Sequence, residues 1–472
     1  MAIWELNTWQ WLALFQHELL LFAGIFFLIG AIDDLAVDFT WLWLRLTGRA
    51  KTPVADRDVL AQAALTGEAA VFIPAWKEAD VIGDTITHAL SVWRQADMRL
   101  YVGCYRNDPA TIEAVIRASR EDPRLRVVIH DRLGPSTKAD CLNRLYVALC
   151  DDERRYGKRV RMVVFHDAED MVDPAALTVL DRAIGTGEDQ AAFVQLPVVP
   201  MPQPGSRWIG SHYCEEFAES HGKGMVVRNA LGAALPGAGV GCAIERGALE
   251  RLRARRPDRL PFAADSLTED YELGLSVASD GGRTRFVRAR GFDGELIGTR
   301  AFFPSRLDTV VRQKTRWVHG IALQGWDRVG WSGGLMEKWM RARDRRGPFT
   351  ALVLLMGYTL LALSGLSWAA IQFGVSEALP LTPMLKALLL ANFAAFVWRA
   401  VWRFGFTSRT HGFVEGLRAI VRIPITNIIA IMAGRRALMA YIATLRGRGV
   451  VWDKTPHMTH PARLRSLQES VA

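Results

Sequence analysis

The chain has 472 residues, half of them hydrophobic, and a formal net charge of +9 at pH 7. This length exceeds one ordinary domain, so we expect a soluble domain of about 250 to 300 residues and a second part. The positive charge does not indicate a nucleic-acid-binding protein, because the aromatic residues lie mostly in long apolar segments. Basic segments held against anionic membrane lipids explain it better.

Three long apolar segments, residues 11–32, 349–373 and 379–398, predict membrane-spanning helices, because about 20 apolar residues cross a bilayer. No basic residue precedes the first segment and no small-residue cleavage site follows it, so we expect a retained anchor rather than a signal peptide. Basic residues gather after the first segment, before the second and after the third. This bias places the N-terminus outside and residues 50–346 on the cytoplasmic side.

Residues 413–434 form a different kind of segment. Arg418 and Arg422 lie one helical turn apart on one face, and a mostly apolar stretch follows them. This pattern predicts a helix in the cytoplasmic interface rather than a fourth span. The expected organisation is an N-terminal membrane helix with an interfacial segment (1–50), a cytoplasmic domain (51–346), a transmembrane hairpin (347–410), and an interfacial helix with a cytoplasmic tail (411–472).

The predicted cytoplasmic domain alternates strands with helices. Helix-like stretches at 80–96 and 109–119 separate short runs rich in Val and Ile: AAVFIPAWKE, LRLYVGCY, LRVVIHD, RMVVFHDAED and AAFVQLPVVP. This alternation predicts an α/β fold with a mostly parallel sheet covered on both faces, whose ligands bind beyond the carboxyl ends of the strands. No GxGxxG loop follows a strand and no GxxxxGK[ST] motif occurs, which disfavours dinucleotide-binding and P-loop proteins.

Carboxylates crowd the end of the fourth predicted strand, in the stretch VVFHDAEDMVDP. Asp167 and Glu169 can both approach one cation where the strand opens into a turn, and Mg²⁺ or Mn²⁺ suits such hard oxygen ligands. The alternative is an acidic loop that caps a helix starting near Pro174, with Asp173 as its N-cap. For Asp170 and Asp173 the two readings stand on equal terms.

Two further motifs combine charged and polar groups. LTEDYELGL opens an amphipathic helix that Thr268 could cap, and the helix N-terminus should keep the pKa of the following carboxylates low. A capping box is the alternative role of these acids. RQKTRWVHG is predicted to be helical; its Arg316 could bind phosphate and its Trp317 could face a sugar ring, unless the pair is an interfacial anchor.

The motifs HDAED, LTED and QKTRW, in that order and ahead of a membrane hairpin, resemble the DxD, TED and Q(Q/R)xRW motifs of membrane-embedded family 2 glycosyltransferases. Cellulose, chitin and hyaluronan synthases belong to that group, and the resemblance covers about residues 68–330. YRNDPAT, HDAEDMVDP and WDKTPH are similar to the bacteriophage adsorption protein B (NfrB) family. By these motifs the chain is identified as a member of the membrane-embedded family 2 glycosyltransferases, with a narrower resemblance to the NfrB family.

The resemblance implies a GT-A-type domain with a Rossmann-like sheet on the cytoplasmic face of a bacterial inner membrane. It also implies an inverting, metal-dependent transferase that elongates a polysaccharide from a UDP-sugar. The NfrB likeness implies an N-acetylhexosamine donor, such as UDP-ManNAc or UDP-GlcNAc, and an exopolysaccharide that serves phage adsorption.

The resemblance further implies roles for single residues. Asp167 and Glu169 would hold Mg²⁺ or Mn²⁺, although Glu169 replaces the commoner second Asp, and Asp270 beside Glu269 would be the general base. Asp108 stands where many relatives have an aspartate pair. For Lys138, the alternative to binding phosphate is an ordinary solvent-exposed lysine. The nucleotide sugar would meet Pro74, Glu78, Asp108, Lys138, Gln313, Arg316 and Trp317, and a gating loop would use Trp452, Lys454, Thr455 and His457.

Two other functions stay open at this point. One is a transferase that adds a single sugar to a lipid-linked acceptor, and the other is a non-catalytic membrane scaffold or phage-entry partner. The clustered acids disfavour a scaffold, which has no need to hold repelling carboxylates together. Because three helices cannot enclose a pore, polymer export would need a homo-oligomer or an outer-membrane secretion partner.

Overall fold

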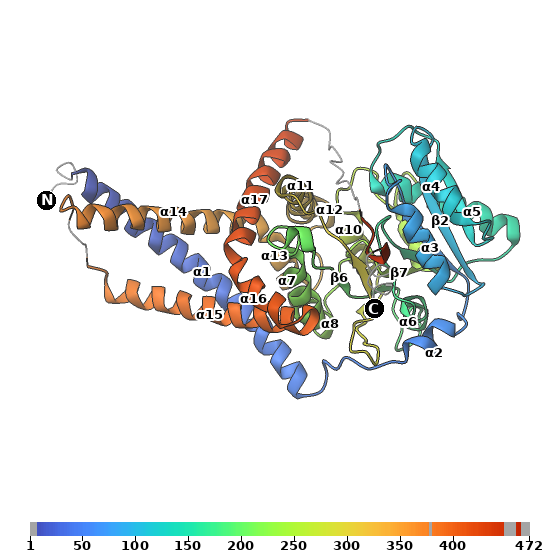
Figure 1. Cartoon of the computed structure of the whole chain (residues 1–472), viewed down its shortest axis with the longest axis horizontal. Coiled ribbons are helices and arrows are strands. Elements are labelled where there is room, and N and C mark those ends of the chain that lie inside the picture. Colours follow the sequence, from blue (N-terminus) through green and yellow to red (C-terminus); the bar gives the residue numbers. More distant parts are fainter. Residues whose placement is uncertain (1–6, 377–379, 448–458, 464–472) are drawn as a thin grey trace.

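The computed structural model describes residues 7–376, 380–447 and 459–463. Its centre is a seven-stranded sheet with the strand order β3-β2-β1-β4-β7-β5-β8 (Figure 1). All neighbouring strands are parallel except β7, which runs antiparallel to β4 and β5. The strands are β1 (Ala69–Pro74), β2 (Met98–Tyr105), β3 (Leu125–His130), β4 (Met162–Phe165), β5 (Phe193–Gln195), β7 (Cys242–Glu245) and β8 (Thr284–Phe286). The predicted mostly parallel sheet is confirmed.

Helices cover both faces of the sheet, which explains why its strands are apolar on both sides. Val71 and Ile73 of β1 join one hydrophobic core, and Phe72 between them joins the other, as the two-residue period of a strand requires. The helices on the first face are α3 (Ile82–Val92), α4 (Pro109–Ser119) and α6 (Ala176–Ala183), with the short α2 (Arg57–Gln62) beside α6; those on the second are α5 (Lys138–Tyr156) and α9 (Arg246–Arg255).

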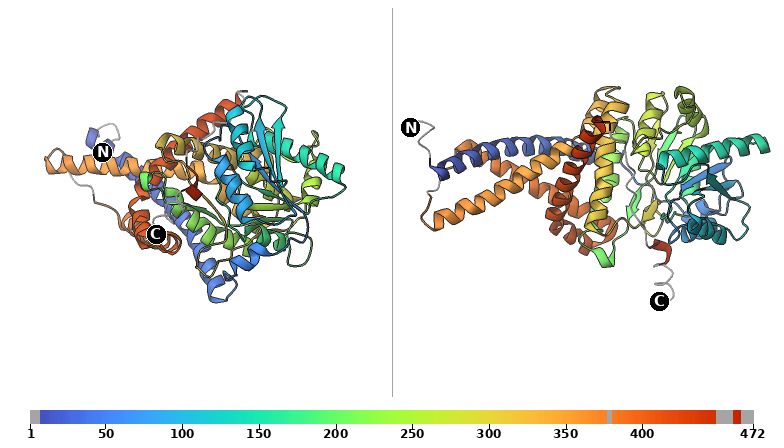
Figure 2. Two further views of the ribbon diagram at one scale, coloured as in Figure 1. Left: turned by 45° about the vertical axis from the view of Figure 1, so that its right-hand side comes forward. Right: turned by 90° about the horizontal axis from the view of Figure 1, so that it is seen from above.

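A layer of shorter elements lies between the sheet and the long helices (Figure 2). Two strands, β6 (Val198–Pro200) and β9 (Thr299–Ala301), pair in parallel within it. Its helices are η2 (Pro204–Ser206), α7 (His212–Glu219), the π-helix η3 (Ser220–Gly224), α8 (Met225–Ala230), α10 (Glu269–Ser279), α11 (Leu307–Trp317), the π-helix η4 (Val318–Gln324), α12 (Gly325–Val329) and α13 (Leu335–Arg345). This layer carries two of the three motifs singled out from the sequence.

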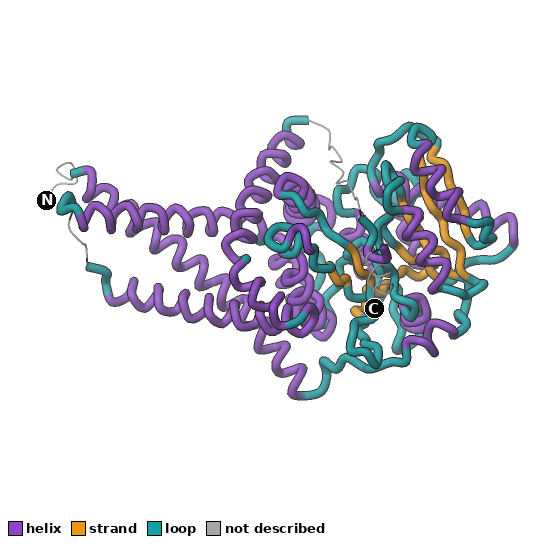
Figure 3. Tube along the Cα trace, in the orientation of Figure 1, coloured by secondary structure: helices purple, strands orange, loops and turns teal. Residues whose placement is uncertain are grey.

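Among the described residues, four helices are long and apolar enough to cross a membrane, where the sequence pattern indicated three. They are α1 (Thr8–Leu46), α14 (Gly347–Gln372), α15 (Pro383–His411) and α17 (Ile423–Leu445). The first three run beside one another away from the sheet, whereas α17 lies across them at the end of the bundle nearest the sheet (Figures 1 and 3). The chain therefore has the helices of a membrane protein, and α17 differs from the others in direction.

The predicted interfacial helix at 413–434 is interrupted in the structure. It consists of α16 (Phe413–Val421) and the first half of α17, with the break at Arg422. The Arg422 side chain is buried and pairs with Glu215 at 2.7 Å and with Glu415 at 2.5 Å. Beyond the break, Ile429 packs with Val310 and Val311 of α11. This arrangement joins α17 directly to the domain that contains the sheet.

Helix α1 continues well past residue 32, where its apolar segment ends. The carboxylates of Asp33 and Asp34 follow, and both are paired with arginines from other helices. Asp34 lies 2.9 Å from Arg343 and 3.0 Å from Arg399, and Asp33 lies 2.6 Å from Arg346. The acids that end the apolar segment thus bind α1 to α13 and α15 rather than ending the helix.

Candidate active site

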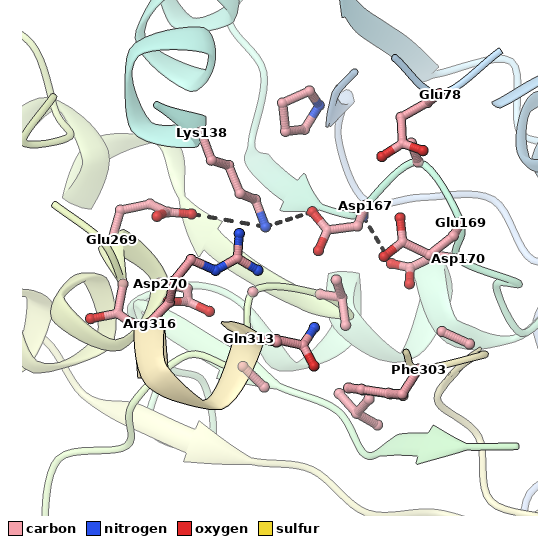
Figure 4. A pocket seen from close by; sticks show the side chains of 18 of the residues that line it. Glu78, Lys138, Asp167, Glu169, Asp170, Glu269, Asp270, Phe303, Gln313 and Arg316 are labelled. Carbon is pink, nitrogen blue, oxygen red and sulfur yellow. Dashed lines mark hydrogen bonds and ion pairs between the residues drawn. The ribbon is translucent and has the colours of Figure 1, made fainter. Parts of the chain in front are cut away.

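The three motifs meet at one cavity of about 1210 Å³, solvent at its mouth included (Figure 4). It lies beyond the carboxyl ends of β1 and β4, where ligands of such sheets bind. Of the residues predicted for the site, those that line this cavity are Pro74, Glu78, Lys138, Asp167, Glu169, Glu269, Asp270, Gln313, Arg316 and Trp317. The predicted gating residues Trp452, Lys454, Thr455 and His457 lie outside the described residues.

The ammonium group of Lys138 joins two of the acidic motifs. Its Nζ lies 2.5 Å from Asp167 Oδ1 and 3.8 Å from Glu269 Oε1. Helix α5 starts at Lys138 because the Thr137 side chain accepts a hydrogen bond from the Asp140 N–H. Burial opposes the charge of Lys138, but the charges of Asp167, Glu269 and Asp270 outweigh it and raise the pKa of the lysine. The solvated-lysine alternative is wrong for this position.

The acidic residues in the loop after β4 have two roles: some stabilise the loop, and others line the cavity. Asp170 is buried and accepts hydrogen bonds from the Asp167 N–H and from His166 Nδ1, each at 2.9 Å. Asp173 is also buried; it accepts a hydrogen bond from the Ala175 N–H and pairs with Arg57 at 3.1 Å. Helix α6 starts only at Ala176, so Asp173 holds the turn before the helix instead of acting as its N-cap. Asp167, Glu169 and Asp170 all line the cavity, but Asp170 is already engaged in hydrogen bonds within its own loop.

The carboxylates of Asp167 and Glu169 fit a divalent cation shared with a substrate. The Lys138 ammonium lies 2.5 Å from Asp167 Oδ1, so a divalent cation bound by Asp167 would have to displace or share this ion pair. Among the described residues no group of three or more His, Cys, Asp or Glu side chains could hold a metal by itself. Mg²⁺ is often held by one or two carboxylates together with substrate phosphates, and two carboxylates are what this loop offers.

The start of α10 is not a capping box. Thr268 occupies the N-cap position, but its side chain makes no capping hydrogen bond. Asp270 Oδ1 accepts a hydrogen bond from the adjacent Tyr271 N–H at 2.8 Å, and its other oxygen points toward the loop at Gly239. Helix capping therefore does not account for the acidic residues at the start of α10.

The expectation of low carboxylate pKa values at this helix start is wrong. Burial raises the pKa of Glu269 to about 8, with Lys138 opposing the shift and the charge of Asp270 adding to it. Burial also raises the pKa of Asp270, again against the effect of Lys138. Desolvation by the surrounding loops outweighs the favourable helix N-terminus. A raised pKa suits a carboxylate that must accept a proton during a reaction.

Glycines allow the stretch PGAGVG to close tightly around Asp270. The Gly237 N–H donates to the Asp270 carbonyl oxygen at 3.1 Å, and a Cβ at Gly237 would lie 2.6 Å from that oxygen. Gly239 has a φ of +81°, and a Cβ there would lie 2.7 Å from Asp270 Oδ2. On the opposite side, a Cβ at Gly320 of η4 would lie 2.5 Å from Thr268. Backbone therefore packs against this motif from two directions.

Helix α11 presents Gln313, Arg316 and Trp317 to the cavity. The Tyr213 hydroxyl donates a hydrogen bond to Gln313 Oε1 at 2.6 Å, and the Trp317 ring packs edge-on against Tyr213 with the ring centroids 5.8 Å apart. Phe303 completes this aromatic group and also lines the cavity. Neither Tyr213 nor Phe303 was found from the sequence, because no motif surrounds them.

Asp108 does not line the cavity. Its side chain accepts hydrogen bonds from the Lys77 N–H at 2.5 Å and from the Thr111 N–H, so it holds the loop after β1 and caps α4.

The last described residues of the chain contact the acidic loop after β4. His460 is buried, and its Nε2 lies 3.1 Å from the carbonyl oxygen of Asp170. Segments 290 residues apart thus meet at the acidic loop.

Comparisons with known proteins show what the chain resembles in sequence and in fold. A family model described as "Glycosyltransferase like family 2" matches residues 67–320. Bacteriophage adsorption protein B of Escherichia coli (strain K12) and bacteriophage N4 adsorption protein B of Escherichia coli O157:H7 are each 32% identical to the chain over 414 residues. These matches cover 82% of this chain and 54% of each relative, so the chain spans about half the length of these curated relatives.

A solved structure shares the fold. It is the mannosyltransferase PcManGT from Pyrobaculum calidifontis in complex with GDP-Man and Mn²⁺, with a TM-score of 0.50 and 17% sequence identity. The match covers 87% of this chain and 99% of the mannosyltransferase. It therefore includes helices outside the sheet as well as the sheet itself.

Proposed function

Because the chain belongs to the family 2-like glycosyltransferases, we propose that it is an inverting, metal-dependent enzyme of the bacterial inner membrane that elongates a polysaccharide from a UDP-sugar. The observation that carries the proposal is the meeting of Asp270, the Asp167 and Glu169 pair, and Arg316 at one cavity. We propose a UDP-N-acetylhexosamine donor, such as UDP-ManNAc or UDP-GlcNAc. The likeness to a mannosyltransferase holding GDP-Man and Mn²⁺ supports a nucleotide sugar and a divalent cation as ligands.

In the proposed reaction Asp270 accepts the proton of the acceptor hydroxyl. The oxygen then attacks the anomeric carbon of the donor sugar while the bond to the diphosphate breaks, which inverts the configuration. Asp270 is held for this task by Gly237 and Gly239, which leave no room for a side chain beside it. Its raised pKa makes it a stronger base than an exposed aspartate once it is ionised.

The remaining groups bind the donor. Asp167 and Glu169 would hold Mg²⁺ or Mn²⁺, which when bound would neutralise the charge that develops on the diphosphate. Arg316 can donate hydrogen bonds to phosphate oxygens, and Trp317 contributes an aromatic wall for the sugar. Lys138 lies between the metal-binding loop and the catalytic carboxylates, where it offsets their repulsion. Asp108 supports the donor site indirectly, through the loop that carries Glu78.

We also propose how the chain sits in the membrane. The catalytic domain would face the cytoplasm, with α1, α14 and α15 crossing the bilayer. α17, which lies across these helices and packs on α11, would rest in the cytoplasmic interface. Export of the product would require a homo-oligomer or an outer-membrane secretion partner, since three spanning helices cannot surround a polymer.

UDP release measured on the detergent-purified full chain tests the proposal. We expect release from a UDP-N-acetylhexosamine that depends on Mg²⁺ or Mn²⁺, and a loss of about 100-fold or more in Asp270→Asn, because general-base catalysis contributes about that much. Asp308→Asn is the matched control; it removes the same charge from the exposed first turn of α11 and should change the rate by less than about twofold. Equal rates in Asp270→Asn and the parent would refute the assignment of the base.

The size of the product separates polymerisation from single addition. A ladder of products after incubation with the donor supports the proposal, whereas one added sugar on a lipid-linked acceptor supports the alternative transferase. Absence of any transfer with every UDP-sugar, metal and acceptor supplied would favour the non-catalytic scaffold. The energetic cost of burying Glu269 and Asp270 together weighs against that last possibility.

A further inference from the structure

Four arginines from three distant parts of the chain gather at the end of the helix bundle nearest the sheet. One lies in the last turn of α1, two follow β8, and one lies in the last turn of α15. The segment after α1 pairs with the backbone around Arg290: the Ala55 N–H donates to the Arg290 carbonyl oxygen at 2.8 Å. We call the following residues the arginine cluster: Arg45, Arg288, Arg290 and Arg409.

The arginine cluster carries positive charge that the described chain does not neutralise. Within residues 7–376, 380–447 and 459–463, none of its members forms an ion pair with an acidic side chain. Arg288 Nε and two nitrogens of Arg290 are buried and lack hydrogen-bond partners. Burial, with the charges of Arg290, Arg409 and Arg45, lowers the pKa of Arg288 to about 10. Buried like charges are costly unless an anion accompanies them.

A small cavity adjoins this charge. Arg288 lines it together with Thr410 and His411 at the end of α15, and the His411 Nε2 is buried without a hydrogen-bond partner. Asp167, the proposed metal ligand, and Asp270, the proposed base, do not line it. The cavity therefore offers guanidinium, hydroxyl and imidazole groups to a ligand, and Val198 and Phe217 lie between it and the cavity in which transfer is proposed.

The surroundings of the arginine cluster are apolar and exposed, as expected at the surface of a bilayer. Trp43 and Leu46 in the last turn of α1 are 50% and 86% exposed, and Phe413 at the start of α16 is 66% exposed. Tryptophans and arginines at the ends of membrane helices mark the headgroup region. Exposed apolar side chains beside basic ones suit the headgroup region, so we take this level of the molecule to lie against lipid.

We propose that the arginine cluster binds the phosphate group of an anionic membrane lipid in the leaflet on the side of the catalytic domain. Guanidinium groups match phosphate oxygens in charge and in geometry. A lipid is preferred to a soluble anion because the site opens at the ends of two candidate membrane helices, beside exposed apolar side chains. The bound lipid would neutralise the arginines and would tie the end of α1 to β8 and α15.

The test measures binding of phosphatidylglycerol to the full chain in micelles of a neutral detergent, by native mass spectrometry across a range of lipid fractions. Arg409→Gln is the first variant, since the side chain is exposed and forms no hydrogen bond within the described structure. We expect about fivefold weaker binding, because each basic residue near an anionic lipid contributes about 1 kcal/mol. Arg409→Lys should retain binding, and the double variant Arg288→Gln/Arg290→Gln should weaken it further.

Arg435→Gln is the matched control, because it removes one exposed charge from α17, outside the arginine cluster. It should leave phosphatidylglycerol binding within about twofold, as expected of a surface substitution away from the site. Equal weakening in Arg435→Gln and Arg409→Gln would show only general surface charge and would overturn the proposal. So would unchanged binding in the double variant, or equal binding of zwitterionic phosphatidylcholine.

A comparison with inorganic phosphate shows whether the site binds a lipid or a soluble anion. Phosphatidylglycerol should raise the thermal unfolding temperature of the parent in a saturable way, and should do so much less in Arg409→Gln. Inorganic phosphate at the same concentrations should have little effect. If phosphate alone stabilised the parent as strongly as the lipid, and lost that effect in Arg409→Gln, the site would belong to a soluble anion and the lipid assignment would fail.

Discussion

Removing the charge of Lys138 tests how the acidic motifs control each other. Lys138 lies 3.8 Å from Glu269 and lowers the pKa of both Glu269 and Asp270 below the values that burial alone would set. In Lys138→Met both pKa values therefore rise. A base that must be ionised then becomes active only at higher pH, so the acid limb of the pH profile should move upward.

The structure sets the size of this shift. Two unit charges 3.8 Å apart interact by about 1 kcal/mol in water and by about 4 kcal/mol at an effective dielectric constant of about 20. At about 1.36 kcal/mol for each pH unit, the pKa of Glu269 should rise by about 0.8 to 3 units, and the acid limb set by Asp270 should move in the same direction. The lysine is mostly buried, which favours the upper part of this range.

The assay is UDP release, with kcat/KM measured across pH at saturating metal. Lys138→Arg keeps the charge and should keep the acid limb in place, although the bulkier head can lower the rate. Thermal unfolding of each variant shows whether the fold is retained. If Lys138→Met lowered kcat/KM equally at every pH and left the limb unmoved, the lysine would act on the donor alone, and its electrostatic coupling to Glu269 and Asp270 would be refuted.

Other substitutions test the remaining parts of the site. Glu169→Gln should raise the metal concentration needed for half-maximal UDP release by at least about tenfold, because even loss of an outer partner of a metal ligand costs about 10- to 100-fold in affinity; an unchanged metal titration would exclude Glu169 as a ligand. Gly239→Ala should cost about 1 to 3 kcal/mol in unfolding free energy and most of the activity, because of both its φ of +81° and the contact with Asp270. Gly281→Ala has a similar φ of +79° but open space around it, so it should lose stability without a matching loss of activity. Arg422→Met should destabilise the protein by about 3 to 5 kcal/mol in detergent, because it leaves the buried Glu215 carboxylate with fewer partners; an unfolding temperature equal to that of the parent would show that this pair contributes little.

Much of the sheet was predictable from local patterns. Runs of Val and Ile marked β1 to β5 because strands covered on both faces are apolar throughout. Strand β7 was missed: it directly follows the stretch PGAGVG, and its place between β4 and β5 depends on antiparallel pairing with strands about 50 to 80 residues away. No local pattern contains that pairing.

The site was predictable in its residue types but not in its electrostatics. The motifs named Asp167, Asp270 and Arg316 correctly as members of one cavity. The pKa of Glu269 was misjudged, because the burial that raises it comes from loops and helices far away in the sequence. Tyr213, which holds Gln313 from 100 residues away, has no signal in the sequence at all. Both the pKa of Glu269 and the Tyr213–Gln313 hydrogen bond depend on contacts between segments that are far apart in the sequence.

The pairing of Asp33 and Asp34 with arginines of α13 and α15 has a practical consequence for anyone seeking a water-soluble fragment. A cut after residue 50 would leave Arg343, Arg346 and Arg399 without these acidic partners, and it would uncover the apolar side chains that now pack on α1. Helix α1 therefore supports the domain from inside as well as anchoring it, and we expect a fragment cut free of this helix to lose stability and aggregate.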